Sequence, residues 1–378
     1  MTVRKTAPLA LLAGATTLVA LAACDGKSDT AAAGGPIKVE ASDTACTVSA
    51  TTANAGNLTF EITNKGTKVT EFYLYAEGDR IMGEVENIAP GLNRRLIVEV
   101  ADAGKYQTAC KPGMSGTGIR GDFTVTGGAA KQNDTNAQKA QATKSYNDYI
   151  ANNTAALQDE TVKFADLVKA GKVDEAKAAY ARTRVYYERI EPVAEKFGDL
   201  DPAVDVREAD LEQGQQFTGF HRLEKDLFKT GLQPDSAQIA DKLVTDVKDL
   251  VAKSKTLQLT ALDLANGAKE LLDEVATGKI TGEEETFSHT DLWDFQANLD
   301  GSKGAITALR PILQAKDAAL VSTLDKEFAN VQSLLDKQRA GDGFKLYNEL
   351  SQDQVKEFAS AVDALSEPLS KVAEVVSK

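Results

Sequence analysis

The spacing of apolar residues changes its period once along this chain of 378 residues. Over residues 37–126, short runs of Val, Ile, Thr and Phe alternate with polar residues and are separated by glycine and asparagine, a pattern typical of β-strands. From residue 138 to Lys378, long segments rich in Ala, Leu, Lys and Glu repeat apolar residues at helical spacing. We therefore predict an all-β domain over residues 37–126 and an all-α domain over residues 138–378, joined by a small polar linker at 127–137.

The first of these regions contains four clear strand candidates. They occupy residues 37–40, 58–62, 96–100 and 123–125, and turn residues such as Asn, Gly and Pro lie between them. Roughly ninety residues of this texture predict a small antiparallel sandwich.

Glycine-rich breaks divide the second region into about seven or eight helices, enough for paired bundles. Pro192 lies within a helical run and should kink or end it, because proline lacks a backbone donor. The expected breaks are at residues 171, 198–199, 231–234, 278–282, 300–301 and 341–343.

The first residues have the features of a bacterial export signal. Arg4 and Lys5 precede an apolar run that is too short to span a bilayer comfortably. The sequence Leu-Ala-Ala-Cys, ending at Cys24, then matches a lipobox, in which the cysteine thiol accepts a lipid. We expect a signal peptide over residues 1–23, lipidation of Cys24, a flexible tether over 24–36 and an extracytoplasmic location, with the lipid holding the protein at the cell membrane. An ordinary signal peptide with Cys24 as a bystander is the alternative.

The formal net charge of −13 excludes one class of partner. Nucleic acid requires a cationic surface, so we expect no nucleic-acid binding. A negative field raises the local concentration of cations, although acidity also serves solubility alone.

Cys46 and Cys110 remain as a pair once Cys24 is assigned to the lipid. In an oxidising compartment such a pair is expected to form a disulfide, and thiolate ligation of a soft metal such as copper is the alternative. A blue-copper centre needs two imidazoles, and no histidine precedes His221.

A second metal site of a harder kind is the remaining hypothesis for the β region. Glu71, Glu84 and Glu86 supply carboxylates in this region. Together with Cys46 or Cys110, these carboxylates form our candidate second site.

The helical region places acids close to His221. His221 and Glu224 are three residues apart and share one helix face, so both can face one ion. Glu188 and Glu191 repeat this spacing upstream, and Asp205 follows. Each pair alone is common on solvated helices. Several carboxylates and an imidazole buried together would need a cation to balance them and would suit Fe(III), Fe(II), Mn or Zn.

Several longer motifs carry a family resemblance over nearly the whole chain after Cys24. The motifs are Glu-Asn-Ile-Ala-Pro-Gly (86–91), Gly-Lys-Tyr-Gln-Thr-Ala-Cys (104–110), Glu-x-x-Glu-Pro-Val-Ala (188–194), Phe-Gly-Asp-Leu-Asp-Pro (197–202), Gly-Phe-His-Arg-Leu-Glu (219–224) and Ser-His-Thr-Asp-Leu-Trp-Asp-Phe-Gln-Ala-Asn (288–298). In the identity and order of these motifs the chain resembles the EfeO/EfeM iron-uptake lipoproteins.

The resemblance implies a cupredoxin-like sandwich joined to an imelysin-like domain of paired four-helix bundles. It implies that iron, as Fe2+ or Fe3+, is captured outside the membrane and delivered to a membrane iron permease, alongside a haem peroxidase of the same uptake system. Copper and zinc are the alternative ions. Whether His221 and Glu224 bind the metal directly or support its ligands stays open. The resemblance places the metal-site residues at Glu188, Glu191, Asp205, His221, Glu224 and either Asp291 or Asp294.

Two other functions compete with iron capture. Imelysin-like domains have been classed as metallopeptidases because of their HxxE motif. The helical zinc-peptidase template needs a second histidine at i+4, where this chain has Lys225, so we expect no enzyme. The third hypothesis is metal-bridged binding of an anionic polymer or chelate.

Overall fold

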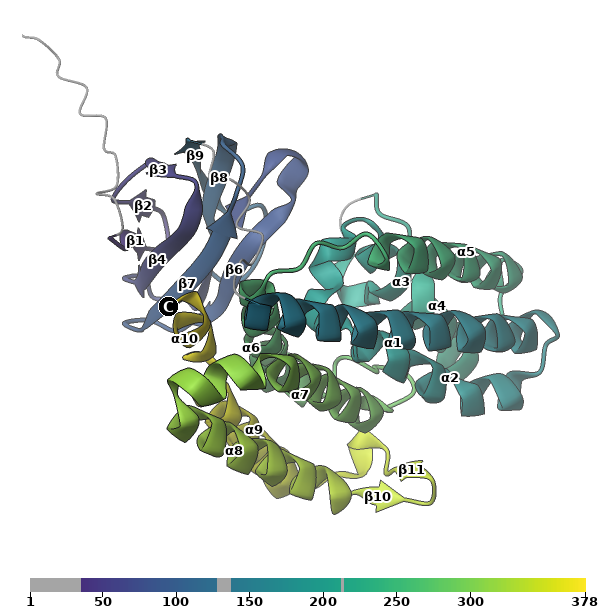
Figure 1. The fold of residues 1–378 in the computed structure, drawn as a ribbon. Helices are drawn as coiled ribbons and strands as arrows, with labels where there is room; N and C mark the ends of the chain where they lie inside the picture. The colour runs from purple at the N-terminus through teal and green to yellow at the C-terminus, as the bar shows by residue number, and fades with distance from the viewer. Residues whose placement is uncertain (1–34, 128–136, 212–213) are drawn as a thin grey trace, which may run out of the picture.

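The computed structural model describes residues 35–127, 137–211 and 214–378. Within them, a β-sandwich is followed by a helical domain (Figure 1), so the predicted fold class is confirmed. None of the described helices is both long and apolar enough to cross a bilayer. The predicted signal peptide and Cys24, with most of the predicted tether and linker, lie outside the described residues.

The sandwich consists of two sheets, and the four predicted strands correspond to β1, β4, β7 and β9. The first sheet has the order β2-β1-β4-β7 and the second has the order β3-β9-β8-β5-β6. The strands are β1 (Ile37–Ala41), β2 (Cys46–Val48), β3 (Thr52–Asn54), β4 (Gly56–Asn64), β5 (Thr70–Tyr75), β6 (Ile81–Ile88), β7 (Asn93–Val100), β8 (Gly104–Cys110) and β9 (Ile119–Thr126).

Two strand pairs differ from the antiparallel sandwich that we expected. The β1–β4 and β3–β9 pairs are parallel. Between β1 and β4 the chain visits the other sheet through β3, so β4 returns to the first sheet in the direction of β1. Such crossovers leave no mark in the alternation of apolar residues, which is why the sequence did not reveal them.

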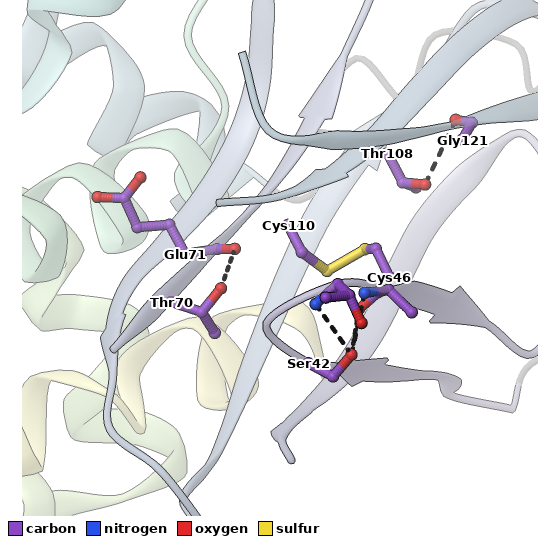
Figure 2. The surroundings of a disulfide bond; sticks show 9 residues. Ser42, Cys46, Thr70, Glu71, Thr108, Cys110 and Gly121 are labelled. Carbon is purple, nitrogen blue, oxygen red and sulfur yellow. Dashed lines mark hydrogen bonds between the residues drawn. A yellow bond between two sulfur atoms is a disulfide. The ribbon is translucent and has the colours of Figure 1, made fainter. Parts of the chain in front are cut away.

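The two sheets are joined by aromatic packing and by one covalent bond. The ring of Phe60 lies 5.2 Å from that of Phe72 and 5.6 Å from that of Phe123. Cys46 of β2 and Cys110 of β8 form a disulfide (Figure 2). Neither sulfur is then a free thiolate, and the alternative in which these cysteines bind a metal does not hold in this structure.

Replacing both cysteines with serine (Cys46→Ser, Cys110→Ser) is expected to destabilise the sandwich by about 2–4 kcal/mol, because the bridge restricts the unfolded chain. Urea unfolding should show the loss, and metal binding by the helical domain should be unchanged. An unaltered unfolding free energy would show that the bridge adds no stability.

The helical domain contains two groups of helices that share α7 (Figure 1). The first group packs α1, α2 and α5 with the short helices α3 and α4, and the second packs α6, α8 and α9. The bounds are α1 (Ala137–Lys169), α2 (Val173–Glu188), α3 (Leu200–Asp205), α4 (Gly219–Lys225), α5 (Ser236–Ser254), α6 (Ala261–Thr277), α7 (Asp291–Lys316), α8 (Ala318–Asp336), α9 (Gln352–Leu369) and α10 (Val372–Ser377), with a small hairpin of β10 (Arg339–Ala340) and β11 (Gly343–Phe344).

One predicted helix break is wrong. Asp300 and Gly301 lie inside α7. A Cβ on Gly301 would lie 2.4 Å from the backbone oxygen of Arg189, so this glycine permits close approach of α7 to the end of α2 rather than a turn. Pro192 behaves as expected, since α2 ends at Glu188 and the proline opens the 3-10 helix η2 (Glu191–Phe197).

The sandwich rests on α6 through β6 and β7. Asn266 of α6 donates a hydrogen bond to the backbone oxygen of Ile97 at 2.8 Å. Asn87 donates to the hydroxyl of Thr277 at 2.9 Å. Ile97 itself belongs to the apolar core of the helical domain, so one face of the sandwich is held against the helices.

Candidate metal centre

A buried cluster of acids lies where α2, α3, α4 and α7 meet a loop of residues 283–290, here called the acidic loop. Residues three or four apart on a helix share a face. The last turns of α2 therefore present Arg184 and Glu188 together, and the first turn of α7 presents Asp291 and Asp294 together. At most 3% of each of the following is exposed: Glu188, His221, Glu224, Glu284, Glu285, Asp291 and Asp294.

A glycine sets the distance between α3 and α4. Gly219 has a φ of 81°, and a Cβ there would lie 2.1 Å from the backbone oxygen of Val204. Only glycine fits, because the left-handed conformation and the contact both exclude a side chain. The close approach places Nε2 of His221 3.6 Å from Oδ1 of Asp205.

Arg184 occupies the centre of the cluster and was not foreseen. Its side chain is fully buried, with Nη2 lying 3.0 Å from Oε1 of Glu284 and Nε 2.7 Å from Oε1 of Glu285. It also forms close ion pairs with Glu188 and Asp205.

Lys279 supplies a second buried cation. Its Nζ lies 2.6 Å from Oε1 of Glu191 and 3.1 Å from Oε2 of Glu188. Asn298 of α7 donates to both of these carboxylates, at 2.6 and 2.8 Å. The expectation that these acids need a bound cation therefore requires correction, since Arg184 and Lys279 already balance part of their charge.

The remaining imbalance appears in the pKa values of the cluster. Burial raises the pKa of Glu191, Glu285 and Asp294 well above the usual range. Burial also raises the pKa of Asp291 to about 6. The raised pKa values favour the protonated carboxyls, and a bound cation would compete with those protons.

Charged neighbours shift the pKa values of two other groups, Glu284 and His221. Burial acts to raise the pKa of Glu284, but Lys279, His221 and Arg184 hold it well below its usual range. Burial and Arg184 act to lower the pKa of His221, and its hydrogen bonds to Glu224 and Glu284 raise it to about 9. The raised pKa favours the protonated imidazole, so metal binding at His221 competes with a proton.

Asp294 is the least satisfied acid of the centre. It is 1% exposed, and within the described residues neither carboxylate oxygen accepts a hydrogen bond. Arg184 Nε lies 3.6 Å away. Oδ2 of Asp291 and Oδ1 of Asn298 also lack partners in this part of the chain. Unsatisfied buried oxygens cost about 1–3 kcal/mol each, so protons or a cation would stabilise them.

The geometry offers three sets of candidate ligands, each with one atom per residue and all atoms within 4.8 Å of one another. Carboxylates with one imidazole suit iron. Asp291 and Asp294 lie beside these sets but in none of them. The sets are Asp205–His221–Glu284, His221–Glu224–Glu285 and Glu188–Glu191–Asp205.

Glu224 has a positioning role in this arrangement. Its Oε1 accepts backbone hydrogen bonds from Phe287 and Ser288 at 2.8 and 2.7 Å, and Oε2 lies 3.4 Å from Nδ1 of His221. These contacts fix the acidic loop and the imidazole. Burial acts to raise the pKa of Glu224, but His221 and the two amides lower it. A carboxylate that already accepts several hydrogen bonds and has a lowered pKa does not suit the role of a peptidase general base.

The predicted second-site acids come together on the outer face of the sandwich, apart from the disulfide. The hydroxyl of Tyr73 donates to Oε2 of Glu71 at 3.0 Å and lies 3.3 Å from Oε1 of Glu86. Glu84 is paired with Tyr73 in the sheet register. Figure 2 shows the carboxylate of Glu71 pointing away from the disulfide.

One cavity of about 340 Å³ connects this face to the helical centre. Strand β6 contributes one wall, and η2, α3, α6 and the acidic loop contribute the rest. Its acidic lining residues are Glu84, Glu86, Glu191, Glu195, Asp201, Asp205, Asp210, Asp263, Glu270, Glu274 and Glu284.

The metal-free protein is expected to lose stability as the pH rises from about 5 to about 8. Burial raises the pKa of Asp201 to about 7 and those of Glu86 and Glu270 to about 8. The folded protein then keeps protons that the unfolded chain releases above about pH 4.5, so unfolding is favoured as pH increases through this window. Thermal unfolding of chelator-treated protein at several pH values measures the effect. A midpoint that rises with pH would contradict it, and bound metal should flatten the dependence.

Comparison with known proteins gives two family matches. The imelysin family model matches residues 142–372. The cupredoxin-like domain model matches residues 12–125.

Curated relatives match over most of the chain. An iron uptake system component EfeO from Escherichia coli O157:H7 is 40% identical over 342 residues, which cover 89% of this chain and 90% of that protein. A protein of the same name from Shigella flexneri is 39% identical with the same coverage. Among solved structures, reduced auracyanin from Roseiflexus castenholzii covers 25% of this chain and 100% of its own, with 17% identity and a TM-score of 0.22, a likeness too low to bear on the fold.

Proposed function

This chain belongs to the imelysin family and is related over most of its length to the EfeO iron uptake components, and from that premise we propose that it captures iron outside the cytoplasm and delivers it to a membrane iron permease. In this proposal the protein is a lipoprotein held at the cell membrane by a lipid on Cys24. A haem peroxidase of the same uptake system is its second partner.

The observation that carries the proposal is the convergence of acids around His221. Support comes from the burial of Glu188, His221, Glu224, Asp291 and Asp294, with Glu191 and Asp205 partly buried. Among the described residues, Asp294 also keeps two oxygens without hydrogen bonds. Carboxylate oxygens with one imidazole are donors that Fe(II) and Fe(III) accept. We assign ligation to the set of Asp205, His221 and Glu284, because their donor atoms lie within 4.8 Å of one another and Asp205 and Glu284 line the cavity. Arg184 contacts all three side chains and would have to move aside for the ion.

The protein's own groups would make capture dependent on protons. The raised pKa values of His221 and several neighbouring carboxyls favour their protonated forms in the metal-free state, and Arg184 and Lys279 pair with acids of the cluster. Iron uptake therefore releases protons, and a fall in pH favours release of the ion. Both effects suit a carrier that must give up its cargo.

The experiment is a titration of the purified chain with Fe(II) under anaerobic conditions and with Fe(III), Mn(II), Zn(II) and Cu(II). We expect saturable iron binding that weakens in Asp205→Asn, while Asp241→Asn, at an exposed aspartate of α5, serves as the control. Absence of saturable iron binding by the unaltered chain would refute the function. Metal-dependent peptide cleavage lost in Glu224→Gln would favour the peptidase instead.

A further inference from the structure

One tyrosine from the second group of helices contacts both ends of the segment that carries the acidic loop. Tyr347 begins the 3-10 helix η6 (Tyr347–Glu349), between β11 and α9, and is 7% exposed. Its hydroxyl donates a hydrogen bond to the backbone oxygen of Ile280, just before the loop. Its backbone N–H donates to the backbone oxygen of His289, near the end of the loop, at 2.8 Å. A single residue therefore ties the two ends of this segment together.

The ring of Tyr347 leaves no room for a side chain on the turn that enters the loop. Gly282 has a φ of 78°, and a Cβ there would lie 2.6 Å from Cδ1 of the tyrosine ring. The ring also packs edge-on against Phe295, with centroids 5.7 Å apart. Tyr347 thus joins the entry of the loop to α7, the helix that carries Asp291 and Asp294.

The exit of the loop has a backbone conformation that needs such support. His289 has a φ of 58°, in the left-handed region that is unfavourable for residues other than glycine. Its N–H donates to the backbone oxygen of Glu285 at 2.8 Å, and its own backbone oxygen accepts from Tyr347. A strained backbone persists only where its surroundings fix it, and Tyr347 provides one of these restraints.

The segment between the two tyrosine contacts carries groups of the metal centre. Glu284 belongs to the assigned ligand set and Glu285 to another candidate set. Within the described residues, α8, α9 and η6 supply no member of any candidate set. Glu224 holds the same loop from α4, through the amides of residues 287 and 288. The loop is therefore fixed from both groups of helices, and Tyr347 is its anchor on the second.

We propose that Tyr347 is a positioning residue of the metal centre, which presents Glu284 to the ion by holding both ends of the acidic loop. This inference rests on the proposed capture of iron. It goes further by giving the second group of helices a part in metal binding, although α8 and α9 do not reach the ion. Tyr347 acts through the loop backbone, since its hydroxyl and its N–H both donate to backbone oxygens.

The test compares two variants that each lose one tyrosine hydroxyl. Tyr347→Phe removes the hydrogen bond to Ile280 and keeps the ring. Tyr106→Phe is the matched control, because the hydroxyl of Tyr106 donates to the backbone oxygen of Asp102 in the sandwich at 2.8 Å. Calorimetry with Fe(II) under anaerobic conditions should show about 10-fold weaker binding by Tyr347→Phe, the lower end of the loss expected when support for a ligand is removed. The control should bind iron as tightly as the unaltered chain.

Hydrogen exchange of the metal-free chains separates positioning from a general loss of stability. The amides of residues 283–290 should exchange about 5-fold faster in Tyr347→Phe, the factor that loss of one hydrogen bond gives, and should be unchanged in Tyr106→Phe. An unaltered iron affinity or unaltered loop exchange in Tyr347→Phe, or an equal loss of affinity in the control, would overturn the positioning role while iron capture stands. Absence of iron binding by the unaltered chain would instead refute the proposed function itself.

Discussion

Iron affinity is expected to fall about 100-fold or more when Glu191→Gln and Asp205→Asn are combined. Loss of an outer-shell partner alone typically costs 10–100-fold in metal affinity. This pair removes Asp205 from the assigned ligand set, together with Glu191, which shares a second candidate set with Asp205. The amides keep the shape of the side chains. Arg184 would still pair with Glu188, Glu284 and Glu285, so the fold should persist. Calorimetry with Fe(II) or Fe(III) gives the affinity directly.

The control for this experiment removes the same charges from the surface. Asp241 and Glu160 are the acids of exposed ion pairs with Lys169 and Lys163, and their amides should leave iron affinity unchanged. Equal affinity in the site variant and the control variant would show that the acids near His221 do not hold the ion.

Replacing Arg184 with methionine (Arg184→Met) should destabilise the metal-free protein by about 3–5 kcal/mol. Removing one partner of a buried ion pair leaves uncompensated charge, and here Glu188, Asp205 and Glu285 all lose their central cation. Urea unfolding measures the loss. Added iron should restore part of the stability, because a cation bound among the same carboxyls compensates them.

Arg182 provides the matched comparison for this variant. It lies on the same helix with an exposed side chain, so Arg182→Met should change the unfolding free energy little. A similar small change for Arg184→Met would mean that the buried acids do not depend on the guanidinium. Loss of stability without any recovery in iron would separate the arginine from the metal site.

The sequence could predict only those members of the cluster that lie three residues apart on the same helix. His221–Glu224 and Glu188–Glu191 were recognisable because residues three apart share a face. Arg184 was missed because an arginine one turn before a glutamate usually marks a surface ion pair. Its burial depends on how α3, α7 and the acidic loop close around it.

The burial of Lys279 and of the acidic loop was not predicted, for a different reason. Residues 278–282 have the glycines of a turn, and turns usually lie at the surface. The run of Glu283, Glu284 and Glu285 has no helical spacing that would mark its burial. Glu284 and Glu285 are buried because Glu224 accepts two backbone hydrogen bonds from the loop, a contact between segments far apart in the sequence.

The spacing of apolar residues predicted the fold, except where a glycine allows two backbones to come into contact. The period of the apolar residues predicted the sandwich and the helices, but Gly301 was misread as a break because glycine marks turns and close contacts alike. The expected disulfide between Cys46 and Cys110 is confirmed, and the closeness of β2 and β8 decides against the thiolate alternative.

Anomalous diffraction at the iron edge, from crystals grown with iron, tests the central claim most directly. We predict a peak bounded by Asp205, His221 and Glu284. No peak inside the helical domain at saturating iron, or peaks confined to exposed carboxylates, would contradict it.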